Sequence, residues 1–147
     1  MLIRNYQQGD QITVSSLKVS KDQSDFIDPI TLSLTNMDRD SYVMEISGHI
    51  IGFFQIDARQ NQLELHEVFI DHRHQGKGHG KEFMSSLAPF LRKNYPRANT
   101  VFLTVNCRNS HAKRLYEFGG FIDTGDLKKD GPAGPQHIMK KSLLSIN

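Results

Sequence analysis

The sequence has a single cysteine, Cys107, among 147 residues, and it has no long hydrophobic run. One cysteine excludes an internal disulfide and is typical of a reducing compartment, so we expect a cytoplasmic protein. No apolar run approaches the ~20 residues that span a bilayer. Residues 1–5 lack the apolar core of a signal peptide, so we expect neither secretion nor a membrane partner.

The sequence also lacks a large excess of either basic or acidic residues. Eighteen basic residues stand beside sixteen acidic ones, and the basic residues are scattered apart from the pairs Lys128-Lys129 and Lys140-Lys141. Nucleic-acid binders usually gather such residues in one stripe, so we expect no nucleic-acid partner. The length, with 37% hydrophobic and 23% charged residues, suits one globular domain over residues 1–147.

The hydrophobic pattern alternates between strand and helix periods along the chain. Strands are expected at 2–6, 42–46, 50–59, 63–70, 100–105, 121–127 and 136–143. Helices are expected at 11–19 with Asp10 as N-cap, within 21–36 around Pro29, at 78–93 and at 109–118. This order predicts an α/β (α+β) fold, with a mixed, mostly antiparallel sheet of about seven strands flanked by about four helices.

The strand at 63–70 carries three ionisable side chains. Alternation along a regular strand places the side chains of 64, 66, 68 and 70 on one face and those of 63, 65, 67 and 69 on the other. On this basis Glu64 and His66 share a face, and Glu67 lies on the opposite one.

A glycine-rich turn follows this strand and precedes a helix, with the sequence Gln75-Gly76-Lys77-Gly78-His79-Gly80. Three glycines in five residues let the backbone approach a ligand, and the helix start offers N–H groups to a phosphate. The spacing is not the dinucleotide motif G-x-G-x-x-G, and Glu82 after Lys81 excludes a Walker A loop. The turn therefore indicates either an anion site or a plain helix cap.

A second pattern follows about 30 residues later. It consists of Asn109, Ala112, Tyr116, Gly120 and Phe121. The first three lie three and four residues apart, so they share one face of the predicted helix. An N-cap role for Asn109 is compatible with a ligand contact.

Together the two patterns resemble the GNAT superfamily of N-acetyltransferases, and the order of elements is similar over nearly the whole chain. The resemblance implies that acetyl-CoA enters between two splayed parallel strands, which end near Ile70 and Val105. The cofactor-binding residues that it implies are Phe69, Ile70, Gln75, Gly76, Lys77, Gly78, His79, Gly80, Asn109, Ala112 and Tyr116.

The implied reaction is direct attack of a primary amine in a ternary complex. An aliphatic ammonium in water has a pKa of about 10.4, so a base must remove its proton. Glu64, His66 and Glu67 are the candidate bases, and each would otherwise be a surface charge or a polar core residue. The resemblance assigns protonation of the leaving thiolate to Tyr116, whose phenol stays neutral at pH 7.

The acceptor is less defined. Residues 21–29 resemble bacterial spermidine and spermine acetyltransferases, with Gln23, Phe26 and Pro29 matching. The acids at 22, 25 and 28 either attract a polycation or face water. We therefore expect a small polyamine-like amine. A protein, peptide or aminoglycoside acceptor and a non-enzymatic CoA-binding regulatory domain stay open as alternatives, as does a homodimer.

We expect no metal ion. His72, His74 and His79 cluster around the glycine-rich turn, but the sequence shows no further ligands at a zinc-site spacing. Histidines of a solvated loop explain the cluster.

Overall fold

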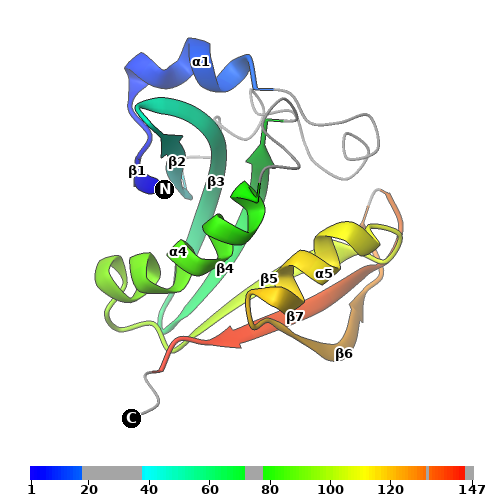
Figure 1. The fold of residues 1–147 in the computed structure, drawn as a ribbon. Coiled ribbons are helices and arrows are strands. Elements are labelled where there is room, and N and C mark those ends of the chain that lie inside the picture. The colour runs from blue at the N-terminus through cyan, green and yellow to red at the C-terminus, as the bar shows by residue number, and fades with distance from the viewer. Residues whose placement is uncertain (18–37, 72–77, 132, 145–147) are drawn as a thin grey trace.

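The computed structural model describes residues 1–17, 38–71, 78–131 and 133–144 (Figure 1). Seven strands form one sheet in the order β1-β2-β3-β4-β5-β7-β6. The strands are β1 (Leu2–Asn5), β2 (Asp40–Ile46), β3 (His49–Arg59), β4 (Gln62–Ile70), β5 (Thr100–Asn106), β6 (Ile122–Lys128) and β7 (Gln136–Ser142). The helices are η1 (Gln8–Asp10), α1 (Gln11–Ser15), α4 (His79–Asn94) and α5 (Ser110–Phe118).

The predicted mixed, mostly antiparallel sheet is confirmed. In the described sheet β4 and β5 run parallel, and the other five neighbouring pairs are antiparallel. Three α-helices fall within the described ranges, where about four were expected; the helix expected within 21–36 lies outside them. None of the described helices is long and apolar enough to cross a membrane.

Asp10 stands at the N-cap position of α1, as predicted, but its side chain does not cap the helix. Asp10 makes no side-chain hydrogen bond to the start of α1. Its carboxylate instead accepts hydrogen bonds from the Gln7 backbone N–H at 2.8 Å and from the Arg4 guanidinium at 2.8 and 2.9 Å. The charged partner on β1 is the stronger donor, so the carboxylate links β1 to η1.

The helices cover the two faces of the sheet unequally. On one face, α4 buries Phe83, Leu87 and Leu91 in the main core, and α5 packs beside it. On the other face, Val14 of α1 packs with Phe53 in a smaller cluster. Of the described helices, only α1 covers the face opposite α4 and α5, and it does so near β3.

A β-bulge interrupts β4 at Glu67. Phe69 pairs with Phe53 and His66 pairs with Gln55. Between these two pairs β4 therefore advances by three residues and β3 by two. Glu67 takes a φ of 55°, in the left-handed region that few non-glycine residues adopt. Such an extra residue bends a strand and changes the direction of the side chains that follow.

The bulge makes the predicted face assignment wrong beyond Glu67. Leu63 and Leu65 belong to the core under α4, and Val68 and Ile70 pack against the same core. Phe69 lies in the cluster under α1, on the opposite face. The regular alternation holds from 63 to 66, so Glu64 and His66 still share a face.

Gly52 of β3 keeps the backbone beside the bulge closely packed. A Cβ at this position would lie 2.6 Å from the Phe69 carbonyl oxygen and 2.5 Å from the Met44 sulfur. We expect Gly52→Ala to lower the free energy of unfolding by about 1–3 kcal/mol, because the strand cannot move aside freely. Denaturant unfolding followed by circular dichroism measures this.

Gly9→Ala is the matched control. No heavy atom lies within 4 Å of the Cβ that it would add, so its effect should stay within about 0.5 kcal/mol. Equal stabilities for the two variants would contradict the close packing at Gly52.

Candidate active site

The parallel strands β4 and β5 pair over a short stretch and then diverge. Their register covers Gln62 with Thr100, Leu63 with Val101 and Glu64 with Phe102, although both strands continue beyond these pairs. The bulge at Glu67 bends β4 just after this point. The divergence that the GNAT resemblance implied is therefore present in the structure, with the strands ending at Ile70 and Asn106 (Figure 1).

A cavity of about 140 Å³ lies in the gap between the diverging strands. Its walls are β4, β5 and α5, closed at one side by Gln136 of β7. Five of the predicted site residues line it: His66, Glu67, Asn109, Ala112 and Tyr116. Residues 42 to 50 positions apart in the sequence thus meet at one place.

Asn109 sets the position of α5 against this cavity. Its side-chain oxygen accepts a hydrogen bond from the Ala112 backbone N–H at 3.3 Å, and the residue is buried. The predicted N-cap is confirmed, and the same side chain lines the cavity. Capping fixes the helix start, so Ala112 and Tyr116 face the gap one turn apart.

Tyr116 is the hydrogen-bond donor of the cavity. Its ring packs edge-on against Phe121 with centroids 6.0 Å apart. Burial, followed by the negative charge of Glu67, raises the pKa of Tyr116 to about 12. The phenol therefore keeps its proton through the neutral range and can give it to an anion that forms nearby.

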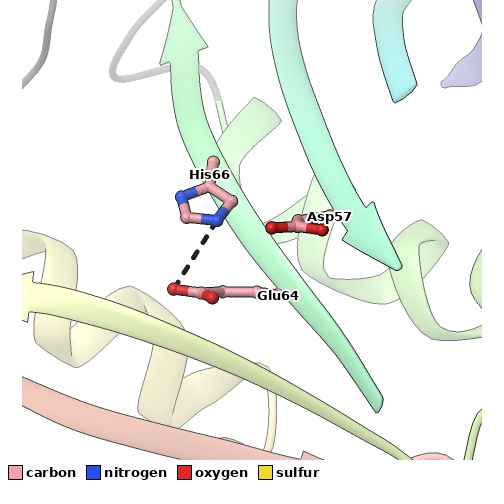
Figure 2. Close-up of side chains that lie close together, drawn as sticks. All are labelled: Asp57, Glu64 and His66. Atoms are coloured by element: carbon pink, nitrogen blue, oxygen red, sulfur yellow. Dashed lines mark ion pairs between the residues drawn. The ribbon is translucent and has the colours of Figure 1, made fainter. Parts of the chain in front are cut away.

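Three ionisable side chains come together on the sheet face away from α4 and α5 (Figure 2). Asp57 of β3 is the register partner of Glu64, and His66 lies two residues further along β4. The Glu64 carboxylate is 3.5 Å from Nε2 of His66, and single ligand atoms of all three lie within 4.8 Å of one another. The sequence analysis did not single out Asp57, although the tight β3–β4 turn predicts that it faces Glu64.

The pair of Glu64 and His66 favours an ionised carboxylate. The contact with His66 lowers the pKa of Glu64, and the positive charges of His66, Lys128 and Arg39 add to the effect; burial acts in the opposite direction and is outweighed. Two carboxylates and an imidazole can hold either a metal ion or an ammonium group. Within the described ranges, this trio is the one group of three such side chains close enough to do so.

A second and larger pocket, of about 690 Å³, occupies this face of the sheet. We call it the acceptor-side pocket. Asp57 and Glu64 line it, together with residues of β5 and of the β6–β7 end. Leu103 and Thr104 line both this pocket and the cavity in the gap. The two hollows therefore meet at the gap, beside Glu64 and His66.

The glycine-rich turn is described only in part. Gly78 has a φ of 81° and precedes α4, and His79 contacts Glu82 at 3.4 Å. A Cβ on Gly80 would lie 3.1 Å from Leu115, so this glycine lets α4 and α5 approach closely. Gln75, Gly76 and Lys77 lie outside the described residues, as do His72, His74 and the acids at 22, 25 and 28.

Comparison with known proteins identifies the family. A model of the acetyltransferase (GNAT) domain matches residues 10–138. The chain belongs to the GNAT acetyltransferase family. A spermine/spermidine N(1)-acetyltransferase of Bacillus subtilis is 27% identical over 146 residues, which cover 91% of this chain and 93% of the relative.

Solved GNAT structures share the fold. The spermidine N-acetyltransferase of Vibrio cholerae in complex with CoA and spermine superposes with a TM-score of 0.76 at 17% identity, covering 97% of this chain and 95% of that one. An aminoglycoside acetyltransferase in complex with coenzyme A gives a TM-score of 0.76 at 17% identity, covering 95% and 93%. At these identities the likeness establishes the architecture.

Acetyl-CoA is the co-substrate of this GNAT chain, and the residues in the gap fit it. The printed pairing of β4 with β5 ends at Glu64 and Phe102, and an extended pantetheine arm fits between two strands that diverge in this way. The first turn of α4 presents N–H groups, which suit a pyrophosphate. Bound there, the thioester supplies the activated acetyl group.

Ala112 gives a direct test of the cavity in the gap. Ala112→Leu places three more carbon atoms in a hollow of about 140 Å³, so we expect the Kd for CoA to rise at least ~10-fold by steric exclusion. Isothermal titration calorimetry measures it. His111→Leu, an exposed change on the same helix, should leave the Kd unchanged. Equal affinities for the two variants would show that CoA does not use this cavity.

Proposed function

We propose that this GNAT enzyme transfers an acetyl group from acetyl-CoA to a primary amine of a small molecule, by direct attack in a ternary complex. The observation that carries the proposal is the meeting of two hollows at the β4–β5 gap. The thioester reaches the gap from the cavity beside α5, and the amine reaches it from the acceptor-side pocket. Both reactants can then be held in contact at once.

The base in this proposal is the pair of Glu64 and His66. Glu64 lines the acceptor-side pocket, His66 lines the cavity in the gap, and the two side chains contact each other at 3.5 Å, so the pair joins the two hollows. The ammonium releases its proton to this pair, and the free amine then attacks the carbonyl carbon of the thioester. Glu67 lines the same cavity as His66, but its negative charge acts on Tyr116, and it does not line the acceptor-side pocket, so it is the less suitable base.

The acid is Tyr116. As the bond from the amine nitrogen to the carbonyl carbon forms, the carbon–sulfur bond breaks and leaves a thiolate. The Tyr116 phenol lines the cavity that receives the thioester, and its raised pKa keeps it protonated. It donates its proton to the thiolate, which leaves as CoA, and the second proton that the nitrogen loses on becoming an amide restores the phenol.

The first acceptors to assay are spermine and spermidine, because the relatives are named for them. The acids Asp57 and Glu64 suit one ammonium group of such a molecule. A cytoplasmic location, supported by the single cysteine, and a homodimer stay predictions.

The base assignment predicts an order among three variants. Glu64→Gln and His66→Gln should each lower kcat/KM about 100-fold at neutral pH, because the amine keeps its proton. Glu67→Gln should lower kcat/KM by a smaller factor. Release of CoA thiol at saturating acetyl-CoA and varied amine concentration measures all three. A larger loss in Glu67→Gln than in the other two would overturn the assignment.

The acid assignment predicts a loss in kcat. Tyr116→Phe should reduce kcat about 100-fold with little change in the KM for acetyl-CoA, because the phenol acts on the leaving thiolate and not on binding. Tyr6→Phe, in the cluster under α1, is the control and should keep wild-type kinetics. Wild-type kcat in Tyr116→Phe, with chemistry rate-limiting, would exclude Tyr116 as the acid.

A further inference from the structure

The acceptor-side pocket carries charges of both signs. Its lining includes three acids, Asp57, Glu64 and Asp130, and three bases, Arg59, Lys128 and Lys129. These formal charges cancel. A polycation is attracted by a lining with net negative charge, and the described part of this pocket does not have one. The described lining therefore fits an acceptor whose own charges also differ in sign.

The charges are also separated along the pocket. Arg59 contacts Asp57 at 3.2 Å, so these two largely offset each other. Glu64 lies at the gap beside His66. Lys128 ends β6, Lys129 follows it, and no acidic oxygen of the described residues lies within 4.0 Å of either ammonium group. The acidic end is thus at the reacting centre. The two exposed lysines stand at the other end beside Asp130, so the formal charge there is +1 (two lysines less one aspartate).

The strand register gives the distance between the two ends. Lys128 pairs with Gln136, which pairs with Asn106 at the end of β5, whereas Glu64 pairs with Phe102. Four residues along a strand correspond to about 13 Å, and the three strand spacings from β4 to β6 bring the separation of the two backbones to roughly 20 Å. Long lysine side chains shorten this gap, and the Lys128 charge is felt at Glu64, whose pKa it lowers. A small molecule with an extended chain of several bonds spans the remainder.

Resting on the proposed function, we propose that the preferred acceptor is a primary amine with an anionic group at its far end. The amine binds beside Glu64 and His66, and the anionic group binds Lys128 and Lys129. The pair of lysines thereby determines specificity: it attracts a carboxylate or phosphonate and repels the second ammonium of a diamine.

Three amines of equal chain length test this proposal. δ-Aminovalerate, cadaverine and pentylamine share the reacting amine and differ at the far end, which is anionic, cationic or neutral. With saturating acetyl-CoA, we expect kcat/KM to be highest for δ-aminovalerate and about ten-fold lower for cadaverine. Aminobutylphosphonate, compared with δ-aminovalerate, distinguishes a phosphonate-type from a carboxylate-type anion.

The double variant K128E/K129E tests the two lysines directly. The ratio of kcat/KM for δ-aminovalerate to that for cadaverine should fall at least ~10-fold, with the KM for acetyl-CoA and the melting temperature unchanged. K93E/R97E changes the net charge equally on exposed residues near the end of α4 and should keep the wild-type ratio.

Each outcome is decisive. The inference is overturned if the wild-type enzyme prefers cadaverine or spermidine, or if the ratio is unchanged in K128E/K129E. It is also overturned if that variant has a raised KM for acetyl-CoA. In each case acetyl transfer to an amine still stands. Failure to acetylate any of these amines, spermidine included, would instead overturn the proposed function, and the inference with it.

Discussion

The site depends on one backbone constraint, the bulge that leaves β4 unable to follow β5. Three residue pairs join these strands, and the left-handed conformation of Glu67 then turns β4 away. An unusual φ at a non-glycine residue costs free energy, which the pairing and packing of the surrounding sheet must offset. Without the bulge, continued pairing would close the gap, and both the cavity and its connection to the acceptor-side pocket would be lost.

The gap also separates two kinds of proton chemistry. On the α5 side, burial keeps the Tyr116 phenol protonated, so that side can supply a proton. On the acceptor side, His66 holds the Glu64 carboxylate ionised, so that side can accept one. The phenol is a far weaker acid than a carboxylic acid, so no proton passes between the two groups before the reaction begins. Here the sheet keeps them on different sides of the place where the thioester and the amine meet.

Much of the fold was predictable, because hydrophobic periods and turn residues are local signals. The strands, α4, α5 and the Asn109 cap lie close to their predicted positions. The bulge at Glu67 could not be predicted, because a glutamate with positive φ has no signature in the sequence. The predicted side-chain directions after it were therefore wrong. Asp57 was missed because it acts through a cross-strand partner. Asp10 stands at its predicted N-cap position, but its carboxylate binds the Arg4 guanidinium in place of the first turn of α1.

The central claim is that the thioester and the amine reach one gap from opposite sides. A crystal structure with CoA and a bound amine tests it most directly. The account predicts the CoA sulfur in the cavity between β4 and β5, within reach of the Tyr116 hydroxyl, with the amine nitrogen on the other side beside Glu64 and His66. CoA bound away from this gap, or an amine seated on the same side as the pantetheine arm, would contradict it.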